Sequence, residues 1–107
     1  MIKYTDALQI ARNYIASMNI EGVTLVIIEQ EVKEYYFGWV FFYQSKEYLD
    51  TKNVSYMIGG NAPIIVNKYS GAITVTGTAY PIETYIEEYK PNIWSKFKRM
   101  LSKFISK

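Results

Sequence analysis

Carboxylates are the side chains with which this sequence could most readily do chemistry. Glu83 and Glu87 are four residues apart on a predicted helix, and Glu88 lies beside them. Two neighbouring carboxylates are the arrangement that glycosidases use as acid and base. On a short surface helix, however, such a pair is usually only solvated charge. The sequence therefore offers one imaginable catalytic pair and a stronger reason to reject it.

The residue types on which most enzymes rely are missing. The sequence contains no Cys and no His, which removes thiol nucleophiles, disulfides, Ser-His-Asp arrangements and metal sites built on thiolate or imidazole. The glycines near residue 60 lack the Gly-Lys-Ser/Thr ending of a phosphate loop, and the acids lack the alternation of a calcium loop. We therefore expect a protein that is not an enzyme and that needs no cofactor or metal.

The length and composition predict one folded body. The sequence has 107 residues, of which 50% are hydrophobic and 17% aromatic, which is enough to bury a core without covalent staples. The longest apolar runs are Val23–Ile28 and Tyr35–Tyr43, far shorter than the ~20 residues that span a bilayer. The first residues do not resemble a secretory signal. We expect a cytoplasmic protein.

The charge is divided between two parts of the chain. Residues 1–89 carry six Lys or Arg against ten Asp or Glu, a net charge of −4, whereas residues 90–107 carry six Lys or Arg and no acid. Such asymmetry says more about partners than the formal net charge of +2 does. We therefore divide the chain into an acidic body, 1–90, and a basic C-terminal segment, 91–107.

The order of predicted elements favours an α+β fold. A helix is expected over about residues 5–18, with Thr5 as its cap, because apolar residues recur on one face. This helix is followed by strands and then by helices again, with no βαβ alternation. The expected architecture is an N-terminal helix, a four-stranded antiparallel sheet made of two hairpins, a C-terminal helix and an extra amphipathic basic helix. The strands are expected at Val23–Val32, Tyr35–Gln44, Pro63–Asn67 and Ala72–Thr78, and the C-terminal helix from Pro81 to Tyr89.

The strand Tyr35–Gln44 is the most distinctive of these elements. Its odd-numbered residues place five aromatic side chains on one face, and the other face is also apolar. A strand of this kind usually lies centrally and is covered on both sides, and Gly38 is expected to make room for a large neighbour. We expect its hairpin with the preceding strand to turn at Lys33-Glu34. The weakly periodic stretch Ser45–Ala62 is the expected functional loop.

The segment after Pro91 has the pattern of an amphipathic helix. Its apolar face includes Trp94, Phe97, Leu101 and Phe104, and its other face is basic. This face could pack on the chain's own sheet, on a second copy to give a homo-oligomer, or on an anionic membrane surface. Nucleic acid is the least favoured of its partners.

Four blocks of the sequence together carry a resemblance to a known family. They are Gly38–Ser45, Gly60–Val66, Gly77–Glu83 and Tyr85–Tyr89, in that order and spacing. The chain resembles the bacterial immunity protein 35 family, or YrhB-like domains, from Tyr4 to Tyr89. This resemblance implies a small cytoplasmic α+β protein, often encoded beside polymorphic toxins, that binds and neutralises a cognate toxin. The segment 91–107 lies outside the resemblance.

The residues that could bind such a toxin are acids and tyrosines of the body. Toxins that act on nucleic acid carry positive grooves, which an acidic inhibitor could find quickly by electrostatic steering and then occlude. Tyrosines would supply apolar anchors, and Asn61 is a polar loop residue beside the sheet. For each of these acids, scattered solubility charge is the alternative interpretation, and Asn61 also fits a structural turn. The candidates are Glu29, Glu31, Glu34, Tyr35, Tyr36, Glu47, Tyr48, Asp50 and Asn61.

A second function belongs to a different class. The chain could be a chaperone-like or membrane-surface adaptor that works through the amphipathic segment 91–107 and exposed aromatic residues. Deleting that segment separates the two hypotheses, because neutralisation of a toxin by the body would survive the deletion.

Overall fold

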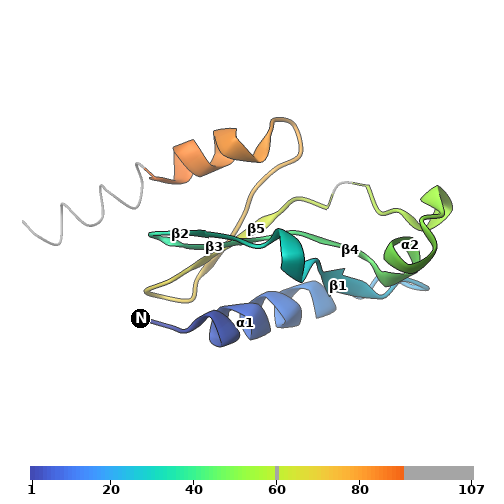
Figure 1. The fold of residues 1–107 in the computed structure, drawn as a ribbon, viewed down its shortest axis with the longest axis horizontal. Helices are drawn as coiled ribbons and strands as arrows, with labels where there is room; N and C mark the ends of the chain where they lie inside the picture. The colour runs from blue at the N-terminus through green and yellow to red at the C-terminus, as the bar shows by residue number, and fades with distance from the viewer. Residues whose placement is uncertain (60, 91–107) are drawn as a thin grey trace, which may run out of the picture.

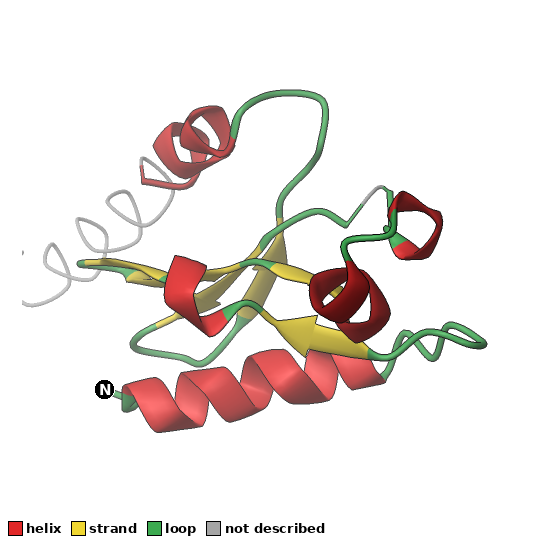
Figure 2. Cartoon of the chain, turned by 45° about the vertical axis from the view of Figure 1, so that its right-hand side comes forward, coloured by secondary structure: helices red, strands yellow, loops and turns green. Residues whose placement is uncertain are grey.

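The fold consists of a central antiparallel sheet with a helix on each side. The computed structural model describes residues 1–59 and 61–90, and the predicted helix after Pro91 lies outside them. Helix α1 lies below the sheet and the helical residues 82–90 lie above it (Figure 1 and Figure 2). The elements are α1 Tyr4–Ala16, β1 Leu25–Ile27, the 3-10 turn η1 Glu29–Glu31, β2 Lys33–Tyr35, β3 Gly38–Phe41, β4 Tyr43–Ser45, α2 Lys46–Thr51, the 3-10 turn η2 Val54–Tyr56, β5 Ile64–Asn67 and β6 Ile73–Val75. The predicted α+β class is confirmed.

All strand pairs of the described residues are antiparallel. Four strands form a sheet in the order β2-β3-β5-β6, and β1 pairs with β4. Only Phe42 separates β3 from β4, and its carbonyl accepts a hydrogen bond from the Ile28 amide at 2.9 Å. The two ladders are therefore halves of one long bent strand, 38–45, which β1 and β2 flank on the same side. The predicted hairpin of Pro63–Asn67 with Ala72–Thr78 corresponds to β5-β6. In the first hairpin β2 pairs with β3, and the pairing of β3 with β5 joins the two hairpins.

The first core fills the space between α1 and the sheet. Ala7 and Ala11 are fully buried, and their small side chains let the helix backbone approach the strands closely. The helix begins at Tyr4, where the Asp6 carboxylate accepts a hydrogen bond from the Lys3 amide at 3.1 Å. Thr5 lies inside the helix, so its predicted capping role is wrong. The buried members of this core are Ala7, Leu8, Ala11, Ile15, Ile27, Trp39, Phe41, Tyr43, Ile64 and Val66.

The second core lies on the opposite face of the sheet, under residues 82–90. Phe37, Val40 and Ile65 are buried there with Ile86 of the helix. The ring centres of Phe37 and Tyr89 are 4.8 Å apart, and the Asn67 side-chain amide donates to the Tyr89 hydroxyl at 3.0 Å. The central aromatic strand is thus covered on both faces, as its sequence predicts.

The first hairpin differs from the prediction in where it turns. The predicted strand Val23–Val32 is interrupted by η1, and Lys33 and Glu34 lie inside β2 instead of at the tip. Tyr35 pairs with Gly38, so the turn consists of Tyr36 and Phe37. This turn sends Phe37 to the second core, on the face opposite Trp39, which corrects the prediction that the odd-numbered aromatics share one face.

Gly38 explains the position of this turn. Its φ is +155°, and a Cβ atom at this position would lie 2.1 Å from the Val66 carbonyl oxygen of β5. The neighbour for which Gly38 makes room is therefore the backbone of the adjacent strand. Only glycine combines this backbone angle with so close an approach.

We expect Gly38→Ala to destabilise the protein by about 3 kcal/mol or more, because the new methyl group must displace a buried strand and the backbone is strained. Urea unfolding followed by circular dichroism measures this loss. Gly59→Ala is the matched control, since nothing lies within 4 Å of a Cβ at that position. Equal stability of the two variants would contradict the role of Gly38.

Candidate functional site

The structure places the predicted binding residues in two separate groups. Glu29, Glu31, Glu34, Tyr35 and Tyr36 lie on η1, on β2 and in the turn that follows. The other four belong to α2, which follows the far end of the bent strand (Figure 1), or to the loop after α2. These are Glu47, Tyr48, Asp50 and Asn61. The candidates therefore do not form one continuous cluster.

Two residues of the first group, Glu29 and Glu34, line a hollow of about 290 Å³ between α1 and the edge of the sheet. We call it the edge hollow. Two carboxylates and two aromatic rings line it, which gives it both negative charge and flat apolar walls. The lining residues are Tyr4, Glu29, Val32, Glu34 and Trp39.

Both carboxylates of the edge hollow are already paired with cations of this chain. Arg12 on α1 lies 3.1 Å from Glu29, and Lys68 lies 2.8 Å from Glu34. The Lys68 ammonium also lies 5.0 Å from the centre of the Trp39 ring. The Lys68 side chain is only 14% exposed, whereas that of Glu34 is 62% exposed. The hollow can thus hold a cation between a carboxylate and an aromatic face, an arrangement that stabilises basic side chains.

Lys68 is a member of this site that the sequence does not reveal. It lies in the predicted turn between β5 and β6, 34 residues after Glu34. Its amide donates to the Phe37 carbonyl at 2.8 Å, and its carbonyl accepts from the Ile2 amide at 2.9 Å. These two backbone bonds hold it beside Trp39. Only the pairing of β3 with β5 brings the two positions together.

Glu29 also belongs to a second hollow. This space of about 360 Å³ lies between α1 and β1 and is lined by Arg12, Ile15, Leu25, Val26, Ile27 and Glu29. The Arg12–Glu29 ion pair therefore stands between two indentations of the same surface. Both residues remain about half exposed, so a partner can reach them.

The loop after α2 is fastened by polar side chains of β4. The buried Gln44 accepts a hydrogen bond from the Ile58 amide at 2.8 Å, and the buried Ser45 hydroxyl donates to the Tyr56 carbonyl at 2.6 Å. The Asn61 side-chain amide donates to the Tyr43 carbonyl at 2.7 Å. Asn61 thus has a structural bond, and its proposed binding role stays a prediction. Gln44 and Ser45 are site residues that the sequence analysis missed, although polar residues ending an aromatic strand are a usable signal.

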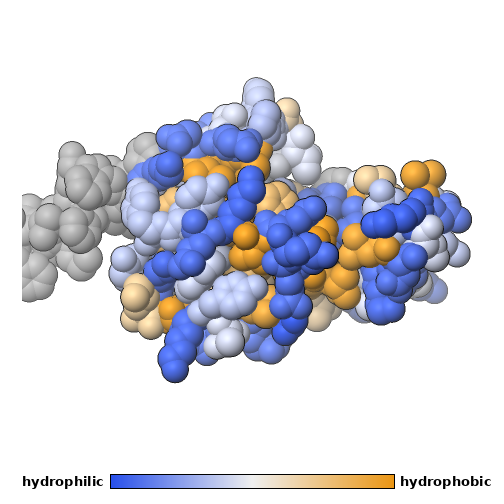
Figure 3. All heavy atoms as spheres, viewed as in Figure 1, coloured by the Kyte–Doolittle hydropathy of each residue, from blue (hydrophilic) through white to orange (hydrophobic). Residues whose placement is uncertain are grey.

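This fastening leaves apolar side chains of the loop in solvent. Val54 is 75% exposed, Tyr56 47% and Met57 53%. Figure 3 shows hydrophobic residues at the surface of the end of the molecule that carries α2 and this loop. Such a group of apolar side chains is typical of a surface that contacts another molecule.

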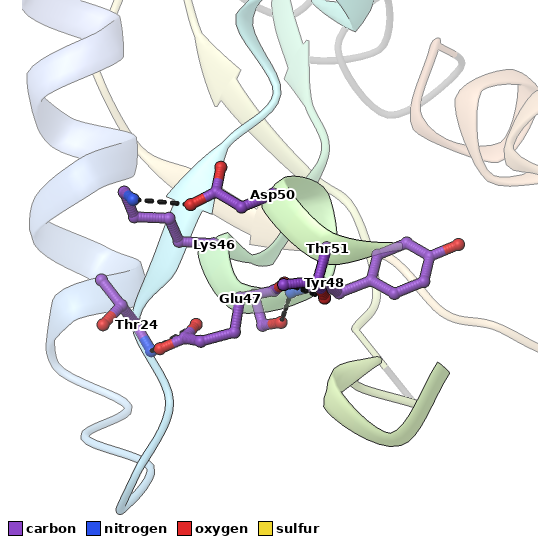
Figure 4. A network of polar contacts seen from close by, with 7 residues as sticks. Thr24, Lys46, Glu47, Tyr48, Asp50 and Thr51 are labelled. Carbon is purple, nitrogen blue, oxygen red and sulfur yellow. Dashed lines mark hydrogen bonds and ion pairs between the residues drawn. The ribbon is translucent and has the colours of Figure 1, made fainter. Parts of the chain in front are cut away.

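Glu47 ties α2 to the beginning of β1, as Figure 4 shows. Its two carboxylate oxygens lie 3.1 and 3.3 Å from the Thr24 amide, which donates to them. The pKa of Glu47 is lowered, first by a hydrogen bond from its own backbone amide in the first turn of α2 and then by Thr24. Lys46 lies 2.7 Å from Asp50, and this carboxylate raises the pKa of Lys46. Two of the predicted binding acids therefore have bonds within the fold.

Two of the three carboxylates of residues 82–90 form separate ion pairs. Glu83 lies 3.9 Å from Lys33, and Glu87 lies 3.1 Å from Lys90, with both acids 71% exposed. Each of these two acids thus has its own lysine, Lys33 on β2 for Glu83 and Lys90 for Glu87. This arrangement is typical of solvated surface charge.

Within residues 1–59 and 61–90, no group of three or more His, Cys, Asp or Glu side chains is placed to hold a metal ion. No helix of this part of the chain is both long and apolar enough to cross a membrane.

We expect Glu47→Gln to lower the melting temperature at neutral pH, because an amide replaces a carboxylate that accepts from two backbone donors. A lowered pKa in the folded state means that ionised Glu47 stabilises the fold above its unfolded pKa and loses this effect as the pH falls through its folded pKa. The melting temperatures of wild type and variant should therefore converge in acid. Glu21→Gln, an exposed loop acid, is the control; a constant difference for Glu47→Gln at every pH would contradict the argument.

The chain is thus a small α+β protein with a charged hollow at one sheet edge and exposed apolar side chains at the end that carries α2. The family model for immunity protein 35 matches residues 5–91. The chain belongs to the immunity protein 35 family, as its sequence blocks indicate. Immunity proteins neutralise toxins, so membership gives the chain this role in general terms.

A curated relative supports the same assignment. The chain is 33% identical over 90 residues to the uncharacterized protein YrhB of Escherichia coli strain K12. The match covers 84% of this chain and 90% of that protein. No solved structure was found to match the chain.

Proposed function

We propose that the chain is a non-catalytic immunity protein that neutralises a cognate toxin by occluding its working surface. Family membership supports the general role. The observation that supports occlusion is the edge hollow, in which the carboxylates of Glu29 and Glu34 face two aromatic rings. We also propose that the protein acts in the cytoplasm, beside the target of its toxin, and performs no reaction there.

The resident cations indicate which chemistry the edge hollow accepts. Arg12 and Lys68 bind its two carboxylates, Glu29 and Glu34, with charge-assisted hydrogen bonds of 3.1 and 2.8 Å. A basic side chain of a toxin could make the same bonds, either by sharing a carboxylate or by displacing the resident cation. The Arg12–Glu29 pair is about half exposed on both sides, and exposed ion pairs contribute little stability, so an exchange at Glu29 costs little.

The predicted partner is therefore a toxin with a positive substrate groove. The body of the chain, residues 1–89, has a net charge of −4, which speeds association with a positive surface. Tyr36, which is 56% exposed at the tip of the first hairpin, lies on the turn next to β2 and provides an apolar anchor. The same groove is unavailable to nucleic acid while the inhibitor is bound.

The double substitution of Glu29→Gln and Glu34→Gln tests this proposal. We expect the association rate with the toxin domain encoded beside the chain's gene to fall roughly ten-fold at low salt and to become less sensitive to salt. Growth of bacteria that express this toxin domain should be rescued less well. The side chains keep their shape, so thermal stability should change little.

Glu21→Gln is the matched control for charge, because Glu21 is an exposed acid in the loop after α1. Because Glu21→Gln removes only one charge, it is compared with the single variants Glu29→Gln and Glu34→Gln. If Glu21→Gln slows association as much as Glu34→Gln does, general charge and not the edge hollow guides the toxin.

A second candidate function is a chaperone-like or membrane-surface adaptor. The exposed side chains of Val54, Tyr56 and Met57 favour it, because they offer an apolar surface to a client. The sequence of residues 91–107, basic on one face and apolar on the other, favours a lipid surface or a second copy as well.

Removal of residues 91–107 distinguishes the two functions. If the body is the inhibitor, the chain 1–90 should neutralise the toxin as well as the full chain does, within about two-fold, and 91–107 is a separate unit. Co-sedimentation with vesicles of anionic lipid tests the second function. Binding of the full chain that is lost in 1–90 would support a membrane-surface adaptor. Loss of neutralisation on truncation would contradict the proposed division of labour.

A further inference from the structure

Strand β6 leaves one edge of the four-stranded sheet without a strand partner in the described part of the chain. It pairs with β5 on one side, with Thr74 opposite Ile65. In the same register, the Asn67 amide donates to the Ala72 carbonyl at 2.9 Å and the Thr76 amide donates to the Pro63 carbonyl at 3.0 Å. Along a strand of an antiparallel pair, one residue directs both its amide and its carbonyl toward the partner strand, and the next residue directs both away from it.

This alternation fixes which backbone groups of β6 face outward. Ala72 and Thr76 bond toward β5, so Thr74, midway between them, also directs its amide and carbonyl toward β5. The amides and carbonyls of Ile73 and Val75 consequently point away from the sheet. They form two donor and acceptor pairs that are symmetric about Thr74.

The edge lacks the features with which proteins protect such strands. Residues 71–79 contain no charged side chain and no proline, whereas charges and prolines are the usual protection of an edge. The opposite edge of the same sheet, β2, carries Lys33 and Glu34. Val75 on β6 is 49% exposed although it is apolar. The two edges of the sheet thus differ in chemistry, and only β6 suits strand addition.

We infer that β6 pairs antiparallel with β6 of a second copy of this chain. Placing Thr74 opposite Thr74 on a two-fold axis sets Ile73 of each copy opposite Val75 of the other. The outward amides and carbonyls then exchange four hydrogen bonds, and the two four-stranded sheets become one of eight strands. In this register each outward amide and carbonyl of Ile73 and Val75 has a counterpart on the second copy.

The side chains agree with this register on both faces. Ile73 packs against the first core, and Val75, two residues on, has its apolar side chain on the same face. Pairs of β-branched residues at neighbouring strands stabilise a sheet, and Thr opposite Thr does so as well. On the other face Thr74 lines a hollow of about 160 Å³ with Thr76 and Tyr85.

The charges favour a second copy over a charged partner segment. A basic or acidic segment would find no opposite charge between residues 71 and 79, and a second β6 brings no like charge to the two-fold axis. Glu88 of residues 82–90 lies at the rim of the hollow and is exposed to water. The paired edge is also distinct from the edge hollow, which lies beside β2 at the other side of the sheet. The inference therefore does not depend on the proposed function.

Val75→Pro tests the inference in the full chain. The Val75 amide points outward, so proline removes a donor from the proposed pairing while leaving the bonds between β5 and β6 in place. Sedimentation equilibrium over a wide range of protein concentration should show wild type associating from 12.5 kDa to twice that mass. For Val75→Pro the dissociation constant should rise at least ten-fold.

Two further variants keep the test decisive. Val75→Thr retains the amide and the branched side chain, so it should associate like wild type. Val75→Lys adds a charge to the edge, and should prevent association even if the proline variant does not fold, as judged by circular dichroism. A monomeric wild type at every concentration would overturn the inference, and so would a dimer that Val75→Pro and Val75→Lys leave intact.

Binding of the toxin domain supplies an independent readout. If Val75→Pro and Val75→Lys remove self-association and leave toxin affinity unchanged, the edge belongs to the dimer. If they weaken toxin binding while the wild type is a monomer, the edge belongs to a toxin strand and the second-copy assignment is wrong. Failure of the edge-hollow variants would contradict the proposed function without affecting this result.

Discussion

The close approach of two backbones at Gly38 determines how the two faces of this protein are built. Because a side chain at this position would collide with the Val66 carbonyl, β3 can lie against β5 only if glycine begins it. The turn before it then directs Phe37 to the face that residues 82–90 cover. The hydrogen bond from the Lys68 amide to the Phe37 carbonyl closes the same corner. It also places the Lys68 side chain over Trp39. The contact between the two main chains therefore determines where this surface cation lies.

The surface charges follow a different principle from the core. Five ion pairs occur in the described residues, and four of them have an acid more than half exposed together with a cation that is at least one-third exposed. Such pairs contribute little to folding stability because water and salt screen them. The pair of Lys68 with Glu34 differs, since the lysine side chain is largely buried and its partner is not. That asymmetry leaves a carboxylate facing water beside an ordered aromatic wall, which suits contact with another protein.

The sequence predicts the elements well because their hydrophobic patterns are local. The strand 35–44 is apolar on both faces, and burial on both faces is what the structure has. Lys33 and Glu34 indicate a turn by their polarity alone, but pairing with Val40 and Trp39 keeps them in a strand. The positions of Lys68, Gln44 and Ser45 depend on contacts between distant parts of the chain. The polarity of Gln44 and Ser45 at the end of an aromatic strand marks them as unusual, but no local pattern reveals their partners or the position of Lys68, so these parts of the candidate site were not predicted.

The loop after α2 is held through its main chain, and this has an evolutionary consequence. Gln44 and Ser45 bind main-chain atoms of Tyr56 and Ile58, and not their side chains. Among the described residues no buried side-chain nitrogen or oxygen lacks a partner, so this attachment is complete. Mutation can therefore replace Val54, Tyr56 or Met57 without removing any bond that shapes the loop. Related chains that share the anchor can diversify the displayed surface rapidly and keep the same scaffold.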